Sequence, residues 1–477
     1  MADRLQSPQG KALTDMANAE RFATRYSART KYIYAWKAYV IYDDRRWARD
    51  ATGTAERQAK DTLRDLIAQA ADLGDEKERE ALIRHALASS SDRGVRAILS
   101  LARSETEIAL TPDRFDADPW LLNVANGTID LRSGTLRSHQ AADYLMALTP
   151  TVYEPNAPCP QWERFLSEIM GGDADLMAFL ARAVGYSLTG DTREQVLFFC
   201  HGSGQNGKTV FLETLADVVG PDYAAAAAFS TFLTQRRDGA APSPDVARLR
   251  GARFVTASEA PGTRPFDESL VKELTGSDTV PARFLHENPF EFRPAFKLWL
   301  RANHRPPVRE QTVAFWRRMR LVPFGVTIPE ERRDRDLGGK LLAERAGILA
   351  WAVRGCLDWQ RHGLGEPAAV RQATETYREE NDVLGEFLDA RCALDPNAWT
   401  ATSALYLAFT AWWEKSHGKH EPPLTSRWFG RALGERADLR AEPRGHANVR
   451  GWGGVRLVDG DLLPLGVQGE EDDDLPF

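Results

Sequence analysis

The segment Val196–Val219, VLFFCHGSGQNGKTVFLETLADVV, decides the fold class of this chain. It opens with an apolar run, 196–200, that is typical of a buried strand. The loop 202–209, GSGQNGKT, then fits the pattern GxxxxGK[ST] at every fixed position, and an apolar-periodic helix follows over 210–219. A strand, a glycine loop and a helix N-terminus place backbone N–H groups and the positive helix end around phosphate oxygens. The segment therefore predicts an α/β core that binds a nucleotide.

The loop predicts ATP as the substrate and Mg²⁺ as the cofactor. Lys208 is expected to reach the β and γ phosphates, and the Thr209 hydroxyl is expected to bind Mg²⁺. The candidate nucleotide-binding residues are Gly202, Ser203, Gly204, Gln205, Asn206, Gly207, Lys208 and Thr209.

Two later strands end in polar side chains. Arg253–Glu259, RFVTASE, ends in a carboxylate, which is placed to polarise the attacking water or to bind Mg²⁺. Lys297–Asn303, KLWLRAN, ends in an amide that can orient water near the γ-phosphate. A turn-forming Asn before His304 explains this second segment equally well when it is taken alone. The order and spacing of the segments favour the catalytic interpretation of Glu259 and Asn303.

The segment 316–324, WRRMRLVPF, carries three arginines beyond the last core strands. A cluster of this kind suits an arginine finger, which stabilises the transition state of ATP held by a neighbouring subunit. The spacing to Phe324 favours Arg318, with Arg317 and Arg320 left open. A solvated basic helix end is the alternative. A finger that acts on a neighbour requires a ring.

These segments, in this order over 202–324, resemble the superfamily 3 helicases of small viruses, phages and plasmids. The similarity is closest to the phage/plasmid and poxvirus-type primase–helicase family. Flanking segments are similar as well: LTDMANAERF at 13–22, LNVANGTIDL at 122–131, GYSLTG at 185–190 and LTGSD at 274–278. The resemblance covers residues 13–380 and is weaker beyond them.

The resemblance implies an AAA+ fold that forms a homo-hexameric ring and translocates on single-stranded DNA, 3′ to 5′, during replication of a phage, prophage or plasmid. Lys208 and Thr209 match the first motif, Glu259 the second, Asn303 the third and Arg318 the finger. Ser258 stands where many relatives carry a second acid, so Mg²⁺ handling would fall to one carboxylate.

Family members place a β-hairpin in the pore between the second and third motifs. Here the matching segment is Val280–Phe292. Arg283 and His286 in this segment, with Lys272 on the preceding helix, are the candidates for contact with the DNA backbone. Each of the three could equally be an ordinary surface charge.

The chain is expected to have six parts. These are an N-terminal α+β accessory region (1–150), a linker and helical collar (151–190), the ATPase core (191–345), a helical extension (346–380), a winged-helix domain (381–466) and an acidic tail (467–477). The winged helix is predicted from three helices followed by glycine-rich strands, with Arg427, Arg431 and Arg436 on the third helix and Arg444, His446 and Arg450 in the wing. Larger relatives carry a primase domain before the matching region. The chain is therefore expected to be the helicase portion, with a separate primase or replication initiator as a partner.

Composition excludes several classes of protein. The hydrophobic content of 43% and charged content of 27% are ordinary for a globular protein, and no apolar run reaches the length of a membrane helix. Four isolated cysteines predict no disulfide framework or zinc site, which fits a cytoplasmic location. The net charge of −7, five units of it at 470–474, argues against a basic surface coat. A ring needs only a few basic residues in its pore to hold one strand.

Two other functions remain open. A motor for DNA packaging or protein remodelling would share the loop and the finger, but it would need neither the hairpin nor the winged helix. An origin-binding or regulatory switch would bind duplex DNA tightly and unwind it negligibly. Stimulation of ATP hydrolysis by single-stranded DNA separates the first of these from a helicase.

Overall fold

This computed structural model describes residues 12–234, 244–259, 264–284, 288–309, 312–418, 423–444 and 448–458. The contacts between its residues divide the chain into two compact units. The core unit comprises Met1–Gly262, Ser269–Arg305 and Arg318–Arg371. The C-terminal unit comprises Thr263–Glu268, Pro306–Arg317 and Gln372–Phe477. Each unit is described by itself below.

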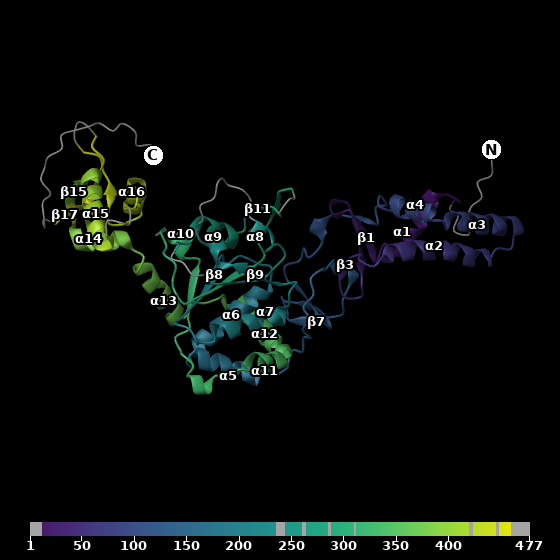
Figure 1. The fold of residues 1–477 in the computed structure, drawn as a ribbon, viewed down its shortest axis with the longest axis horizontal. Helices are drawn as coiled ribbons and strands as arrows, with labels where there is room; N and C mark the ends of the chain where they lie inside the picture. The colour runs from purple at the N-terminus through teal and green to yellow at the C-terminus, as the bar shows by residue number, and fades with distance from the viewer. Residues whose placement is uncertain are drawn as a thin grey trace. The chain divides into compact units, whose positions relative to one another are not determined.

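A five-stranded parallel sheet lies at the centre of the core unit (Figure 1). Its order is β14 (Met319–Pro323), β8 (Leu197–His201), β13 (Lys297–Ala302), β10 (Phe254–Ser258) and β9 (Ala224–Ala228). Every neighbouring pair is parallel, so the carboxyl ends of all five strands meet at one edge. The predicted α/β class is confirmed as a mixed α/β structure with a parallel sheet.

Helices cover one face of this sheet. They are α5 (Pro160–Ile169), α6 (Ala174–Leu188), α7 (Lys208–Val219), α11 (Leu337–Ala343) and α12 (Arg345–His362), all on the same side in Figure 1. Trp162 stacks on Phe211 of α7 with ring centroids 5.6 Å apart. The helices α6 and α12 meet at glycines, since a Cβ at Gly355 would lie 2.0 Å from the Ala181 carbonyl oxygen. Large apolar side chains thus fix α7, and with it the loop before it.

The N-terminal region combines helices with two small sheets. The helices are α1 (Asp15–Tyr26), α2 (Thr54–Ala70), α3 (Glu76–Ser89) and α4 (Asp92–Ala102). One sheet has the order β3 (Trp47–Arg49), β2 (Ala38–Tyr42), β1 (Thr30–Ile33) and β4 (Ala109–Leu110); the other is β5 (Leu121–Val124), β6 (Gly127–Asp130) and β7 (Thr135–Arg137). The strands β5, β6 and β7 follow one another in sequence and pair antiparallel, so the second sheet is a meander.

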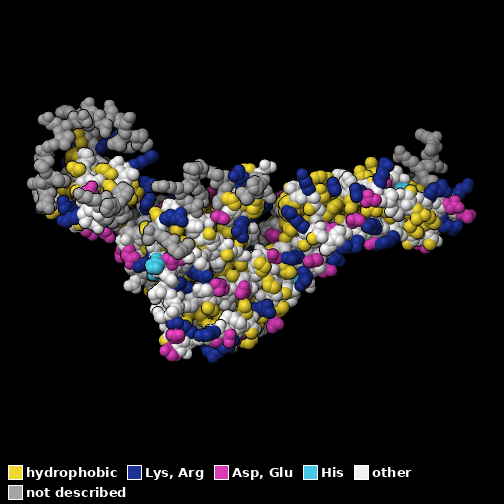
Figure 2. Space-filling model, viewed as in Figure 1, with side chains coloured by type: hydrophobic (Ala, Val, Ile, Leu, Met, Phe, Trp, Pro, Cys, Tyr) yellow, Lys and Arg dark blue, Asp and Glu magenta, His cyan; other side chains and the backbone are white. Residues whose placement is uncertain are grey.

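The surface of α2 and α3 carries interspersed charges of both signs (Figure 2). Lys60 pairs with Glu56 at 2.6 Å, and Arg64 pairs with Asp61 at 2.7 Å. Ion pairs three and four residues apart are typical of a solvated helix face. This part of the surface is therefore not a basic coat of the kind that grips duplex DNA.

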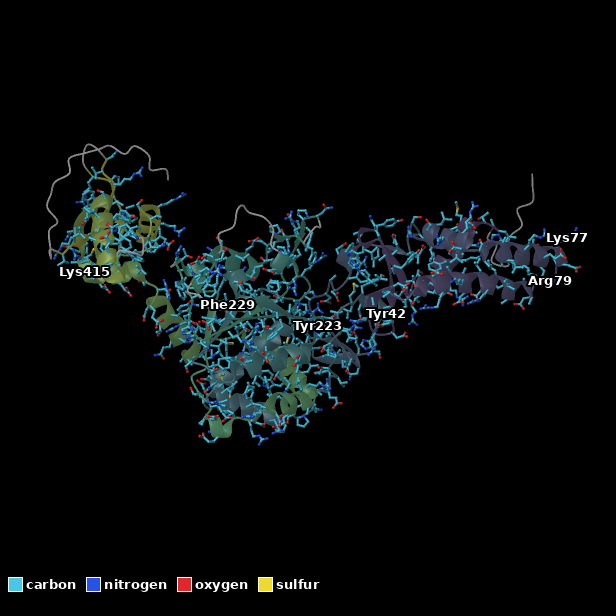
Figure 3. All side chains as sticks on the ribbon, viewed as in Figure 1. Tyr42, Lys77, Arg79, Tyr223, Phe229 and Lys415 are labelled. Atoms are coloured by element: carbon cyan, nitrogen blue, oxygen red, sulfur yellow. The ribbon has the colours of Figure 1, made fainter. Side chains whose placement is uncertain are left out.

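Hydrogen bonds connect the turn after α7 to the N-terminal region. The Asp222 carboxylate accepts hydrogen bonds from Arg46 Nη1 at 2.6 Å and from the Leu148 N–H at 3.1 Å. The hydroxyl of Tyr223, labelled in Figure 3, accepts one from the buried Asn123 N–H at 3.0 Å. Because α7 begins at the predicted phosphate loop, these bonds join the N-terminal region directly to the element that carries this loop.

Two buried basic side chains, Arg253 and Lys297, donate hydrogen bonds to backbone carbonyls at the opposite, amino edge of the sheet. Arg253, before β10, donates to the Leu188 and Leu121 carbonyls at 2.8 and 2.9 Å. Lys297, at the start of β13, donates to the Thr189 carbonyl and is only 1% exposed. Burial lowers the pKa of Lys297 well below its usual range. Both side chains lie away from the carboxyl edge, so their role is to fasten the loop after α6.

From residue 383 onward, the described part of the C-terminal unit has the element order helix, strand, helix, helix, strand, strand. These elements are α14 (Val383–Arg391), β15 (Cys392–Ala401), α15 (Thr402–His417), α16 (Ser426–Gly434), β16 (Arg440–Ala441) and β17 (Gly451–Leu457). The strands form one sheet in the order β15-β17-β16, and Phe387, Phe409 and Phe429 pack between the helices. β15 was not predicted from the sequence.

One predicted surface residue of this unit is corrected by the structure. Arg436 lies two residues beyond α16, rather than on it, and pairs with Asp382 at 2.5 Å. It therefore fastens the start of α14 instead of facing outward. Arg427 and Arg431 are both exposed on α16. His446 and the acidic run 470–474 lie outside the described residues.

Candidate nucleotide-binding site

The loop between β8 and α7 is shaped by left-handed backbone positions. Gly204, Gln205 and Gly207 have φ values of 104°, 54° and 82°. Gly207 also leaves no room for a side chain, because a Cβ there would lie 2.5 Å from Ile169 Cγ2. Successive turns of this kind direct backbone N–H groups into a concavity that suits an anion. The helix α7 begins directly after it, at Lys208, which adds the positive helix end.

Lys208 is the centre of a buried hydrogen-bond group. Its ammonium donates to the Gly202 carbonyl at 2.8 Å, to Asn206 Oδ1 at 3.0 Å and to Asn303 Oδ1 at 3.0 Å. Burial lowers the pKa of Lys208, and the nearby charge of Arg301 acts in the same direction. The lysine is therefore held at the carboxyl edge of the sheet, next to the loop that would cradle phosphates.

Glu259 and Asn303 lie side by side at the ends of their strands. The Asn303 backbone N–H donates to Glu259 Oε2 at 2.5 Å, and His304 Nδ1 lies 3.1 Å from Glu259 Oε1. The amide side chain of Asn303 meanwhile contacts Lys208. The structure thus brings together the three residues predicted from separate segments, Lys208, Glu259 and Asn303. His304 was regarded only as a turn neighbour, and its contact with Glu259 was missed.

The chemistry of the oxygen donors suits Mg²⁺ bound together with a nucleotide. Thr209 is exposed in the first turn of α7, and Glu259 is half-buried at the same edge of the sheet. Hydroxyl and carboxylate oxygens, with water and phosphate completing the shell, are what Mg²⁺ takes in such sites. These two residues are the ones that would hold the ion.

A further charged group lies beside this site and was missed by the sequence analysis. Arg301, two residues before Asn303 in β13, donates from Nε to Ser258 Oγ at 2.5 Å. Its Nη1 and Nη2 lie 3.2 and 3.1 Å from Glu213 Oε1 on α7. The sequence could have indicated it, since an arginine interrupts an otherwise apolar strand next to a predicted catalytic residue.

The three candidate finger arginines differ in burial. Arg318 is buried, with Nη2 3.5 Å from Gln195 Oε1, and its carbonyl accepts from the Leu197 N–H at the amino end of β8. Arg320 is half-buried, with Nε 3.9 Å from Glu366. Arg317 is exposed.

The predicted hairpin is confirmed. The strand β11 (Val280–Ala282) pairs antiparallel with β12 (Phe290–Phe292). Phe284 and Phe290 stack with centroids 5.4 Å apart, and the Arg250 guanidinium lies 5.2 Å from the Phe290 ring. Arg283 is exposed and Lys272, on α9 (Glu268–Thr275), is half-exposed. His286 lies outside the described residues.

Comparison with known proteins shows what parts of this chain are similar to. The family described as "D5 N terminal like" matches residues 19–171. "Putative helicase L207/L206" of Acanthamoeba polyphaga mimivirus is 26% identical over 307 residues, covering 59% of this chain and 32% of that protein. "Putative primase C962R" of African swine fever virus (isolate Tick/Malawi/Lil 20-1/1983) is 23% identical over 326 residues, covering 62% and 34%.

The chain is thus similar, in part of its length, to a D5-type family and to viral proteins named as helicase and primase. It spans about a third of the length of each of these two relatives. A solved structure, the apo structure of the NrS-1 C-terminal region, is similar with a TM-score of 0.49 and 11% identity, covering 92% of this chain and 98% of that one. Within the described residues, no helix combines the length and the apolar character that a membrane span requires.

Proposed function

We propose that this chain is the ATP-hydrolysing subunit of a ring-shaped DNA helicase with an AAA+ core. The observation that carries the proposal is the hydrogen-bonded group of Lys208, Asn303 and Glu259 at the carboxyl edge of the parallel sheet. This group joins a cation, an amide and a carboxylate beside a loop that suits phosphate. Those are the parts that phosphoryl transfer to water requires. The similarity to relatives named as helicase and primase supports a role in DNA replication.

Each residue has a separate part in the proposed reaction. Lys208 and the loop N–H groups would hold the phosphates, and Thr209 and Glu259 would hold Mg²⁺, which neutralises charge on the phosphates. Glu259 would also orient and polarise the attacking water, with Asn303 fixing the position of that water. A residue from a neighbouring subunit would complete the site. Exposure favours Arg317 for this role, because a finger must reach beyond its own subunit, whereas Arg318 is buried.

The hairpin β11–β12 supports the choice of single-stranded DNA as the partner. Toward its turn, the hairpin combines stacked aromatic rings with arginine, at Phe284, Phe290 and Arg250. Base stacking on aromatic side chains and charge attraction to the backbone are the two general means of holding a single strand. With Arg283 and Lys272 nearby in sequence, the hairpin is the proposed contact with the strand in the pore.

Single-stranded DNA is expected to raise the rate of ATP hydrolysis, and ATP is expected to drive unwinding of a forked duplex. The matched control is Glu259→Gln, which keeps the shape of the side chain but removes its charge. This variant should still bind ATP, while hydrolysis falls by about 10²–10⁴-fold. The measurements are phosphate release with and without a single-stranded oligonucleotide, and strand displacement from a labelled fork.

Two results would redirect the proposal. Hydrolysis that does not respond to single-stranded DNA would favour a packaging or remodelling motor. Tight binding to duplex DNA with negligible unwinding would favour an origin-binding switch. Loss of ATP binding in the Glu259→Gln protein would show that this carboxylate has a different role.

We also propose that the C-terminal unit is a winged helix that contacts duplex DNA near the fork. The order of its helices and strands supports this, with α16 as the third helix. Arg427 and Arg431 are four residues apart and both exposed, so they share one face of α16.

Changing both arginines, Arg427→Gln with Arg431→Gln, should weaken binding to forked DNA. It should also reduce the slope of log affinity against log salt by about two, because each phosphate contact contributes about one. The control changes Arg79 and Arg84 to Gln on α3, where Arg84 is exposed and the side chain of Arg79 is 41% exposed. An unchanged slope, measured by fluorescence anisotropy at several salt concentrations, would assign the face of α16 to solvent or to a protein partner.

A further inference from the structure

Arg301 lies between the strand that carries the phosphate loop and the strand that carries Glu259. In the register of the sheet it pairs with Cys200 of β8 on one side and with Ser258 of β10 on the other. Arg301 contacts Glu213 of α7, so its side chain lies on the α7 side of the sheet. Asn303 contacts Lys208. A cation on this strand is therefore close to the place where the terminal phosphate of a bound nucleotide is expected.

The contacts of Arg301 leave it able to change partners. Both Nη atoms donate to the same oxygen of Glu213, whose side chain is 63% exposed, while that of Arg301 is 22% exposed. Ion pairs with a solvated partner contribute little to stability. Glu213 is also four residues after Thr209, so it lies on the helix face that carries the predicted Mg²⁺ ligand. Exchange of this carboxylate for a more strongly bound anion would cost little.

Ser258 makes the surroundings of Arg301 suited to an anion rather than to a metal ion. Its hydroxyl oxygen accepts the Arg301 Nε hydrogen at 2.5 Å, so the hydroxyl hydrogen is directed elsewhere. Many relatives carry a second acid at the position of Ser258, and that carboxylate would attract a metal ion. In this chain the same position offers N–H and O–H donors instead. Such donors form their strongest hydrogen bonds with charged oxygens such as those of phosphate.

We propose that Arg301 binds the terminal phosphate of ATP in its own subunit, exchanging Glu213 for this phosphate. Arg301 is then the residue that distinguishes ATP from ADP at this site. The inference rests on the proposed function, since it requires a nucleotide on the loop 202–209. It assigns a role to a residue that lies in the segment ending at Asn303 but was given no role in the sequence analysis.

The test is the affinity of the full chain for ADP and for the non-hydrolysable analogue AMP-PNP, measured by calorimetry with Mg²⁺ and with EDTA. Arg301→Gln should weaken AMP-PNP binding by about 10- to 100-fold, as expected for loss of hydrogen bonds to a charged group. ADP binding should stay unchanged. Arg301→Lys, which keeps the charge but not the fork of donors, should show a smaller loss that is again confined to AMP-PNP.

The matched control is Glu213→Gln, which removes the same ion pair from the other side. If Arg301 contacts phosphate, this variant binds AMP-PNP as tightly as the unaltered protein or more tightly. If the pair is only structural, Glu213→Gln and Arg301→Gln will weaken both nucleotides alike, and the inference is overturned. It is also overturned if Arg301→Gln binds AMP-PNP normally. An unaltered protein that binds neither nucleotide would instead contradict the proposed function itself.

Discussion

Replacing Lys208 with alanine is expected to abolish ATP hydrolysis and DNA unwinding while leaving the fold intact. The Lys208 ammonium is the cation that the loop holds at the carboxyl edge, through three oxygen acceptors. Preorganised donors of this kind act where charge develops in the transition state, and removing one costs about two to three orders of magnitude in turnover. Loss of a phosphate-binding cation also weakens ATP binding, so the loss at low ATP concentration should be larger still.

The fold should survive this change, because Lys208 contributes hydrogen bonds rather than apolar packing. A typical hydrogen bond contributes about 0.5–1.5 kcal/mol to stability. Phosphate release and a thermal melt followed by circular dichroism are the two measurements. Lys77→Ala, at an exposed lysine of α3 labelled in Figure 3, is the control. Turnover at the unaltered rate in the Lys208→Ala protein would mean that the loop does not hold the substrate.

The sequence predicts the phosphate loop well because its geometry is local. The glycines, the lysine and the following helix lie within one short segment, and their positions follow from the backbone conformation they require. The ends of β10 and β13 could be predicted for a related reason. In a parallel sheet, the carboxyl ends of the strands meet at one edge, so Glu259 and Asn303 were expected at the edge that carries Lys208. The strand that ends in Glu259 was also expected to adjoin β8, and this is wrong, because β13 lies between β8 and β10.

Two strands could not be predicted because their sequences favour other structures. β9 consists of five alanines, residues that favour helices when they are considered alone. It is a strand because every one of its residues pairs with a residue of β10. β15 contains Pro396 and Asn397, which usually end strands. The pairing with β17 accommodates them through a register shift between Asp395 and Trp399.

The roles of single charged residues were the hardest part to predict. Arg253 and Lys297 belong to the motif-bearing strands, but carbonyl acceptors distant in sequence determine that both are buried and structural. Spacing favoured Arg318 as the finger, whereas its burial favours the neighbouring Arg317. Sequence shows that a charge is present, but only the fold shows which acceptors surround it.

The second large effect is expected at the finger. In a ring, the finger of one subunit serves the ATP held by Lys208 of the next. Arg317→Ala should therefore be as inactive as Lys208→Ala, because a finger supplied by a neighbour raises turnover by about three to five orders of magnitude. Arg318→Ala and Arg320→Ala are the companion variants. Arg317 is exposed, so its loss should leave the thermal melt unchanged, whereas loss of the buried Arg318 should lower the melting temperature.

Mixing the two inactive proteins tests the ring directly. When Lys208→Ala and Arg317→Ala subunits assemble together, some interfaces pair an intact loop with an intact finger. ATP hydrolysis in the presence of single-stranded DNA is the measurement, because a coordinated ring can hydrolyse ATP at a few interfaces and still unwind poorly. The account predicts that the mixture regains a part of the unaltered activity that neither protein shows alone. It is contradicted if no finger variant loses activity and the protein sediments as an active monomer with ATP and DNA.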